Sequence, residues 1–135
     1  MANPAILTKF TVSHVNDSDF KGGGLRSHAE YRDLGLVDAT NGKVRAHVIR
    51  RNFAVPLPEI SAASKRHHHD LSFQLVYVLK GWIKVEIEGQ GEMLMRTGSC
   101  WTQPGGIRHK VLDRGEDTEL LEIVMPADFE TVNVD

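Results

Sequence analysis

Hydrophobic and polar residues alternate along much of the chain between residues 43 and 125, with the two-residue period of β-strands. The clearest case is residues 82–88. There Ile83, Val85 and Ile87 share one face, and charged side chains occupy the other. Such a pattern predicts a strand with one face in the core and one in solvent. We therefore expect these three side chains to point inward.

Other short segments carry a strand signal and are separated by turns. The further predicted strands cover residues 43–49, 75–79, 92–96, 99–103 and 119–125. Residues 29–41 predict a short strand followed by a turn at Asn41-Gly42, a good hairpin signal. Helix is expected only as a turn near residues 126–129. Many short strands with regular turns indicate an all-β sandwich or barrel of two antiparallel sheets over residues 43–125.

The beginning of the chain differs from the rest. Residues 1–28 are mostly polar and include Gly22-Gly23-Gly24, which predicts an arm with at most an edge strand. Residues 29–135 then form a single domain, since a chain of 135 residues can bury one core. Edge strands of small barrels are usually covered, and two-fold dimers are the commonest assembly. We therefore expect a homodimer that uses the arm.

Composition excludes several classes of partner. The chain has 16 Lys and Arg against 18 Asp and Glu, scattered along its length, for a net charge of −2. Nothing in this distribution indicates a nucleic-acid or membrane partner. A single cysteine, Cys100, cannot form an internal disulfide, and the first residues lack the features of a signal peptide. We expect a cytoplasmic protein, with Cys100 buried as a packing residue.

Candidate chemistry lies in two short segments. In a strand, His67 and His69 point to the same face, and His68 points to the other. His109 follows the turn Pro104-Gly105-Gly106, which predicts a bend that brings the next strand onto the same site. Imidazole nitrogens bind transition metals such as zinc, iron, nickel and copper. The spacing therefore indicates a metal site.

The same residues resemble the two motifs of the cupin family. The first motif reads His67-x-His69-x4-Gln74-x6-Gly81. The second motif reads Gly98-x5-Pro104-x-Gly106-x2-His109-x3-Asp113. Three positions depart from the family pattern, because Ser61 and Asp113 replace Gly and Asn, and Gln74 replaces the usual Glu. The resemblance implies an all-β, double-stranded β-helix (jelly-roll) cupin barrel with an N-terminal arm.

The resemblance also implies a set of metal ligands. They are His67, His69, Gln74 and His109. The metal would be a divalent transition ion, and Zn, Fe, Ni, Mn and Cu all stay open. Gln74 has two interpretations, direct coordination through its amide oxygen or a hydrogen bond to a ligand. A cupin that keeps these residues and binds no metal tightly is the alternative.

Other histidines have simpler interpretations. A single histidine is more often structural or at the surface, and we interpret four in this way: His14, His28, His47 and His68. The strand at residues 43–49 contributes to the pocket wall according to its register. The alternatives are Arg45 and His47, or Val44 and Ala46.

The Gln74 substitution bears on function. Three neutral imidazoles and a neutral amide leave the charge of a divalent metal uncompensated, which favours an anionic oxygen or enolate ligand. One hypothesis is a metal-dependent enzyme for a small oxygenated or enolisable substrate, either a dioxygenase or a Lewis-acid cyclase or isomerase. The other is a non-catalytic binding or sensing module whose metal holds a small-molecule ligand or the fold. The sequence does not identify the substrate.

Overall fold

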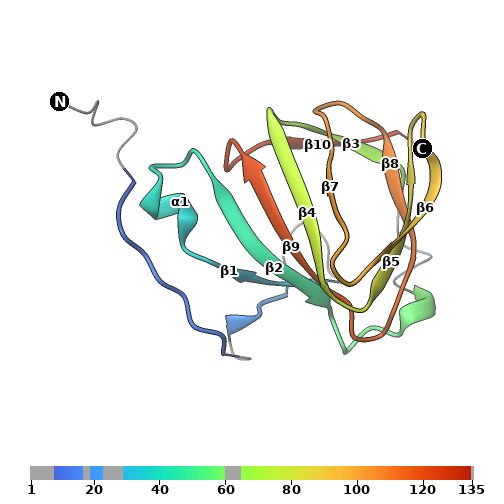
Figure 1. Cartoon of the computed structure of the whole chain (residues 1–135), viewed down its shortest axis with the longest axis horizontal. Coiled ribbons are helices and arrows are strands. Elements are labelled where there is room, and N and C mark those ends of the chain that lie inside the picture. Colours follow the sequence, from blue (N-terminus) through green and yellow to red (C-terminus); the bar gives the residue numbers. More distant parts are fainter. Residues whose placement is uncertain (1–7, 17–18, 23–28, 60–64, 135) are drawn as a thin grey trace.

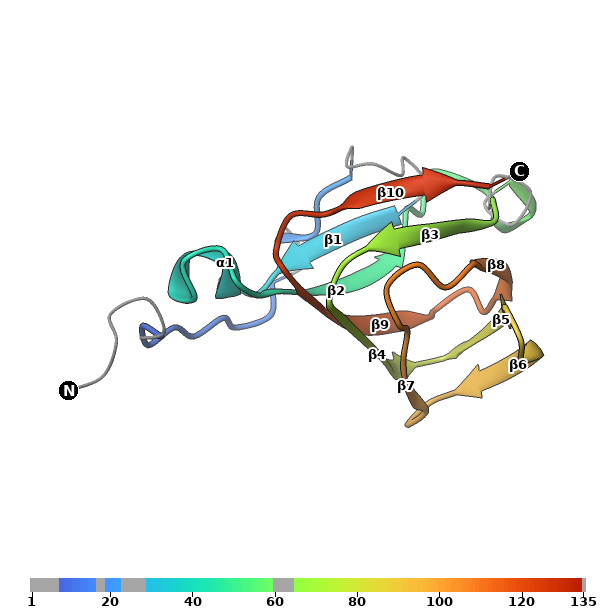
Figure 2. The same cartoon turned by 90° about the horizontal axis from the view of Figure 1, so that it is seen from above.

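The computed structural model describes residues 8–16, 19–22, 29–59 and 65–134. Its elements, in chain order, are β1 (Ala29–Asp33), α1 (Leu36–Ala39), β2 (Arg45–Arg51), β3 (His67–Asp70), β4 (Phe73–Lys80), β5 (Trp82–Ile87), β6 (Gly91–Arg96), β7 (Cys100–Thr102), β8 (His109–Arg114), β9 (Glu119–Met125) and β10 (Glu130–Asn133). Within these residues the strands form two five-stranded sheets, ordered β1-β2-β9-β4-β7 and β10-β3-β8-β5-β6. The sheets face each other, and α1 lies outside them (Figures 1 and 2). This is the all-β barrel that the sequence predicts.

An apolar core fills part of the space between the sheets. Ile83, Val85 and Ile87 on β5 are 2%, 4% and 7% exposed, as the alternation predicts. They pack with residues of β4, β6 and β9: Val76, Val78, Met95 and Leu120. Intervening residues on β5, such as Lys84, are exposed because a strand alternates its faces. The core therefore occupies the part of the barrel near β4, β5, β6 and β9.

A cavity of about 820 Å³ occupies much of the remaining interior. On β2 its wall includes Arg45 and His47, whereas Val44 and Ala46 are not among its lining residues. The register of β2 therefore resolves the two alternatives in favour of the polar pair. Because the strands around this region turn polar side chains inward, the barrel interior combines an apolar side with a side suited to polar chemistry.

The segments at both ends of the barrel depart from the sequence-based prediction. Residues 29–41 contain β1 as expected, but helix α1 follows it before the turn at Asn41 and Gly42, which both have positive φ. Residues 126–129 form no helical turn, because the Ala127 backbone N–H donates to the Gly42 carbonyl and its own carbonyl accepts from Arg45. Strand β10 was not predicted, since its four residues are largely exposed and lack clear alternation.

No helix in the described part of the chain is long and apolar enough to cross a membrane.

The described part of the arm runs beside β1 and α1 (Figure 1, blue). The Lys9 N–H donates to the Ala39 carbonyl at 2.8 Å, and Lys21 forms an antiparallel bridge with Tyr31 of β1. Phe10 is 91% exposed, and Val12 and Val15 are also exposed. The predicted boundary at residues 28 and 29 falls partly on residues 23–28, which lie outside the described residues.

Cys100 corrects another expectation, since it is exposed and not buried. It lies on β7, an edge strand of the first sheet, opposite Tyr77 of β4. Its neighbour Trp101 has the opposite parity and lines the cavity. Cys100 therefore faces outward because of its parity on β7, and the general preference of cysteine for burial does not decide its exposure.

Candidate metal centre

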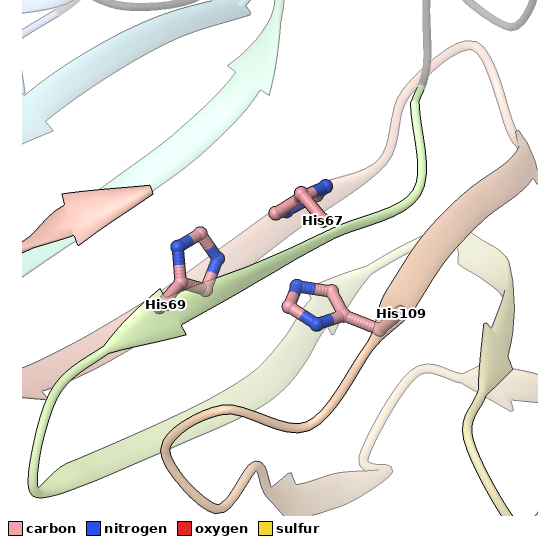
Figure 3. A group of neighbouring side chains, drawn as sticks. All are labelled: His67, His69 and His109. Atoms are coloured by element: carbon pink, nitrogen blue, oxygen red, sulfur yellow. The ribbon is translucent and has the colours of Figure 1, made fainter. Parts of the chain in front are cut away.

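The three predicted histidines converge inside the barrel. His67 and His69 lie two residues apart on β3, and His109 begins β8 as the register partner of His67. Figure 3 shows the three rings turned toward a common space. Their potential ligand nitrogens all lie within 4.8 Å of one another. The structure therefore brings together residues that are about forty positions apart in the sequence.

The turn before β8 positions His109. A Cβ on Gly105 would clash with the carbonyl oxygen of Leu71, so only glycine allows this close approach. Gly106 has a positive φ of 84° and donates its backbone N–H to the His69 carbonyl at 2.9 Å. The predicted bend is thus confirmed, and it is held directly against the end of β3.

Backbone carbonyls fix two of the rings. His67 Nδ1 lies 2.7 Å from the Lys65 carbonyl oxygen, and His109 Nδ1 lies 3.0 Å from the Ile107 carbonyl oxygen. A carbonyl oxygen can only accept, so Nδ1 carries the proton in both neutral rings. Nε2 then carries the lone pair. This tautomer is the one that a metal bound through Nε2 requires.

The third ring is held by side chains. His69 Nδ1 lies 2.9 Å from Thr131 Oγ1 on β10, and the ring meets Phe129 edge-on at a centroid distance of 5.3 Å. A hydroxyl can accept from Nδ1–H just as a carbonyl does. Strand β10, which the sequence did not predict, therefore supports the orientation of His69.

Gln74 is buried beside the histidines on β4 and is hydrogen-bonded at both ends of its amide. Its Nε2 donates to Glu122 Oε2 at 2.8 Å, and its Oε1 accepts from Gln103 Nε2 at 3.1 Å. Gln103 Nε2 also lies 3.3 Å from His109 Nε2. These bonds place the amide oxygen of Gln74 near the histidine cluster.

Glu122 is the main feature of this site that the sequence interpretation missed. Its Oε1 lies 2.7 Å from His47 Nε2. Burial by itself raises the pKa of the Glu122 carboxyl, but interactions with His47, then Gln74 and His69, outweigh burial and lower the pKa below its ordinary value. The ionised carboxylate of Glu122 is therefore hydrogen-bonded to the amide nitrogen of Gln74. The sequence interpretation considered only the four proposed ligands, and the structure adds a negative charge from Glu122 on β9 behind them.

His47 is a further part of this site. The interpretation of His47 as structural or at the surface did not include its pairing with Glu122, and the structure shows it half-buried on the cavity wall. His68 points away from the cluster as expected, and His14 is exposed. His28 lies outside the described residues.

Gln103 was also missed, and it connects the site to the barrel wall. It is 5% exposed and accepts a hydrogen bond at Oε1 from Trp101 Nε1 at 2.9 Å. Its amide nitrogen bridges Gln74 and His109. One polar chain therefore runs from His47 through Glu122, Gln74 and Gln103 to His109.

This donor set suits a transition metal. Three imidazoles with hydrogen-bonded Nδ1 atoms supply borderline ligands, and a buried carboxylate nearby offsets part of a divalent charge. The residues present therefore fit an ion of the class that the sequence indicated, and the identity of that ion is not fixed by them.

The family model for the cupin domain matches residues 57–124 of the 135-residue chain, and the chain belongs to the cupin family. This match contains both motifs and the three clustered histidines.

Solved structures share the fold at low sequence identity. The polyketide cyclase RemF from Streptomyces resistomycificus has a TM-score of 0.64 and 18% identity, over 92% of this chain and 86% of that one. A sugar phosphate isomerase from Silicibacter pomeroyi has a TM-score of 0.63 and 18% identity, over 91% and 82%. KdgF from a Halomonas species has a TM-score of 0.60 and 17% identity, over 83% and 92%. The search of curated proteins gives no match.

Proposed function

We propose that this cupin is a metal-dependent enzyme that acts as a Lewis acid on a small, enolisable oxygenated substrate, in an isomerisation or cyclisation. In this proposal His67, His69 and His109 hold a divalent transition metal, with the amide oxygen of Gln74 as a weak fourth ligand. One observation carries the proposal: carbonyl oxygens accept from Nδ1 of two rings, which directs their Nε2 lone pairs toward the shared space.

Two further observations support it. The cavity of about 820 Å³ leaves room for a small molecule beside the histidines. Among proteins with the same fold, one is named a polyketide cyclase and another a sugar phosphate isomerase. Their names indicate that proteins with this barrel fold can catalyse cyclisations and isomerisations. Such an activity in this chain depends on the residues of its own site.

Each residue has a defined task in the proposed reaction. When bound, the metal would polarise a substrate carbonyl and so make the neighbouring C–H group more acidic. The Lys65 and Ile107 carbonyls keep His67 and His109 in the required tautomer. Glu122 orients the Gln74 amide by accepting from its nitrogen, which turns the amide oxygen away from β9. Together these contacts preorganise the site before substrate binds.

The proposal predicts metal-dependent enolisation without oxygen consumption. Untagged protein should contain about one transition-metal ion per chain by elemental analysis. In deuterated buffer it should speed hydrogen exchange next to the carbonyl of hydroxyacetone, dihydroxyacetone or acetylacetone, followed by NMR, and chelation should remove this effect. Oxygen uptake coupled to loss of the ketone would indicate a dioxygenase. Binding of these compounds without accelerated exchange would indicate a binding module, and either result contradicts the proposal.

We also propose a cytoplasmic homodimer in which the arm contributes to the interface. Phe10, Val12 and Val15 are exposed by 91%, 61% and 72% in one chain, and a partner would remove this apolar surface from water. Light scattering at tens of micromolar should give the mass of a dimer, and deletion of residues 1–16 should give a monomer. A monomeric parent, or a deletion variant that stays dimeric, would contradict this assembly.

A further inference from the structure

A second pair of ionisable groups lies on the cavity wall, away from β3 and β8. His47 on β2 and Glu122 on β9 are register partners, and His47 Nε2 lies 2.7 Å from Glu122 Oε1. Their side chains retain 13% and 17% of their accessible surface, and both line the cavity. The pair is therefore largely desolvated but still reachable from the space that a substrate would occupy.

The hydrogen bond sets the chemistry of the His47 ring. An ionised carboxylate only accepts, so His47 Nε2 is the donor. In the neutral ring the lone pair is then on Nδ1, on the opposite side of the ring from Glu122. The Tyr31 ring packs against His47 at a centroid distance of 5.0 Å, and Asp33 of β1 is its register partner on the other side. A histidine oriented by a carboxylate is an arrangement suited to proton transfer.

Glu122 itself is poorly placed to take a proton from substrate. Both of its oxygens are engaged, one with His47 and one with Gln74. Its position instead allows it to stabilise an imidazolium at His47.

We propose that His47 is the proton-transfer residue of the reaction and that Glu122 is its positioning partner. His47 Nδ1 takes a proton from the carbon next to the substrate carbonyl. The electron pair of the broken C–H bond forms a C=C bond, and the carbonyl π pair moves to oxygen to give an enolate. In an isomerisation of a hydroxyketone, the imidazolium returns the proton to the former carbonyl carbon, and the hydroxyl proton passes to the enolate oxygen as the new carbonyl forms. In a cyclisation, the enolate carbon forms a C–C bond to a second carbonyl carbon of the substrate, the π pair of that carbonyl moves to its oxygen, and the imidazolium protonates this oxygen. This inference rests on the proposed function, because it names the base for that chemistry.

The first test separates proton transfer from binding. His47→Gln keeps a side-chain N–H for Glu122 but has no basic nitrogen, so the fold and metal content should be retained. In the exchange assay above, with the ketone that the parent exchanges fastest, the variant should lose about 100-fold or more in rate. The ketone dissociation constant should change by less than about threefold. His14→Gln removes an exposed histidine of the arm and serves as the matched control, with parental rates expected.

A second variant distinguishes the loss of the basic nitrogen of His47 from a loss of folding. His47→Ala leaves room for a free base, and added imidazole should restore part of the exchange rate. Parental exchange by His47→Gln would overturn the role of His47 and leave the proposed function intact. Failure of the parent to exchange any of the ketones would overturn the proposed function, and this inference with it.

The last measurement needs no metal and no substrate. Long-range proton–nitrogen NMR of the metal-free protein should show His47 with its proton on Nε2 when the ring is neutral. In Glu122→Gln the preference for this tautomer should weaken, because the neutral amide can donate as well as accept. A parental His47 ring with its proton on Nδ1 would overturn the proposal, since the lone pair would then face Glu122.

Discussion

Alanine at any one of His67, His69 or His109 should abolish stoichiometric metal binding. Each imidazole would supply one of three strong bonds, and changes to residues that merely support a ligand already cost about 10- to 100-fold in affinity. A loss of more than about 100-fold is therefore expected for a ligand itself. Gln74→Ala should only weaken binding, because an amide oxygen is a poorer ligand. Elemental analysis after dialysis measures the retained metal.

Thermal unfolding gives an independent measure of the same effect. A metal at about 100 times its dissociation constant should stabilise the parent protein by about 2.7 kcal/mol, and the histidine variants by far less. His68→Ala is the matched control, since His68 lies on the same strand and points to the other face. Loss of metal from this control, with retention by His67→Ala, would refute the assignment of the ligands.

The second large effect is expected at Gln74. The change Gln74→Glu places a carboxylate against Glu122, whose oxygen now accepts from the Gln74 amide at 2.8 Å. Two buried carboxylates at this distance cannot both stay ionised without a large penalty, so the unfolding free energy should fall by about 3 kcal/mol. Urea denaturation of the metal-free variant measures the loss.

The stability of the Gln74→Glu variant should depend on pH, and the repulsion between its two carboxylates sets the sign of this dependence. The second carboxyl of such a pair has a pKa raised above its unfolded value, so its contribution to stability is present below the unfolded pKa and is lost as the pH rises. The deficit relative to the parent should thus be larger at about pH 8 than at about pH 5. Combining Gln74→Glu with Glu122→Gln exchanges the two groups, restores the hydrogen bond in reverse and should recover most of the stability. A double variant as unstable as Gln74→Glu alone would contradict this account.

Much of the fold follows from local sequence pattern. The two-residue period of β5 predicts the inward positions of Ile83, Val85 and Ile87, and turn residues mark the strand ends. Helix α1 and strand β10 do not follow in this way, because they are short and mostly contact other segments. The exposure of Cys100 likewise depends on which face of β7 turns toward the cavity, and the pairing of β7 with β4 sets this face.

The histidines of the site were predictable, but the groups behind them were not. His67 and His69 lie two residues apart in a predicted strand, and His109 follows the recognisable turn at residues 104–106. Glu122 carries one signal that was available, as a charged residue in the middle of the apolar strand β9. Its meaning depends on the pairing of β9 with both β2 and β4, which places it between His47 and Gln74. The sequence pattern of a single strand does not predict which distant strands pair with it.

The hydrogen bond between Gln74 and Glu122 also constrains how this site can evolve. A change of Gln74 to glutamate alone brings two carboxylates together, and a change of Glu122 to glutamine alone removes this carboxylate from the barrel interior. To reach the arrangement with glutamate at position 74 on β4, the protein must first make one of these single changes. The resulting intermediate either holds two repelling carboxylates or lacks the carboxylate of Glu122. The two positions should therefore change together among proteins that descend from this one.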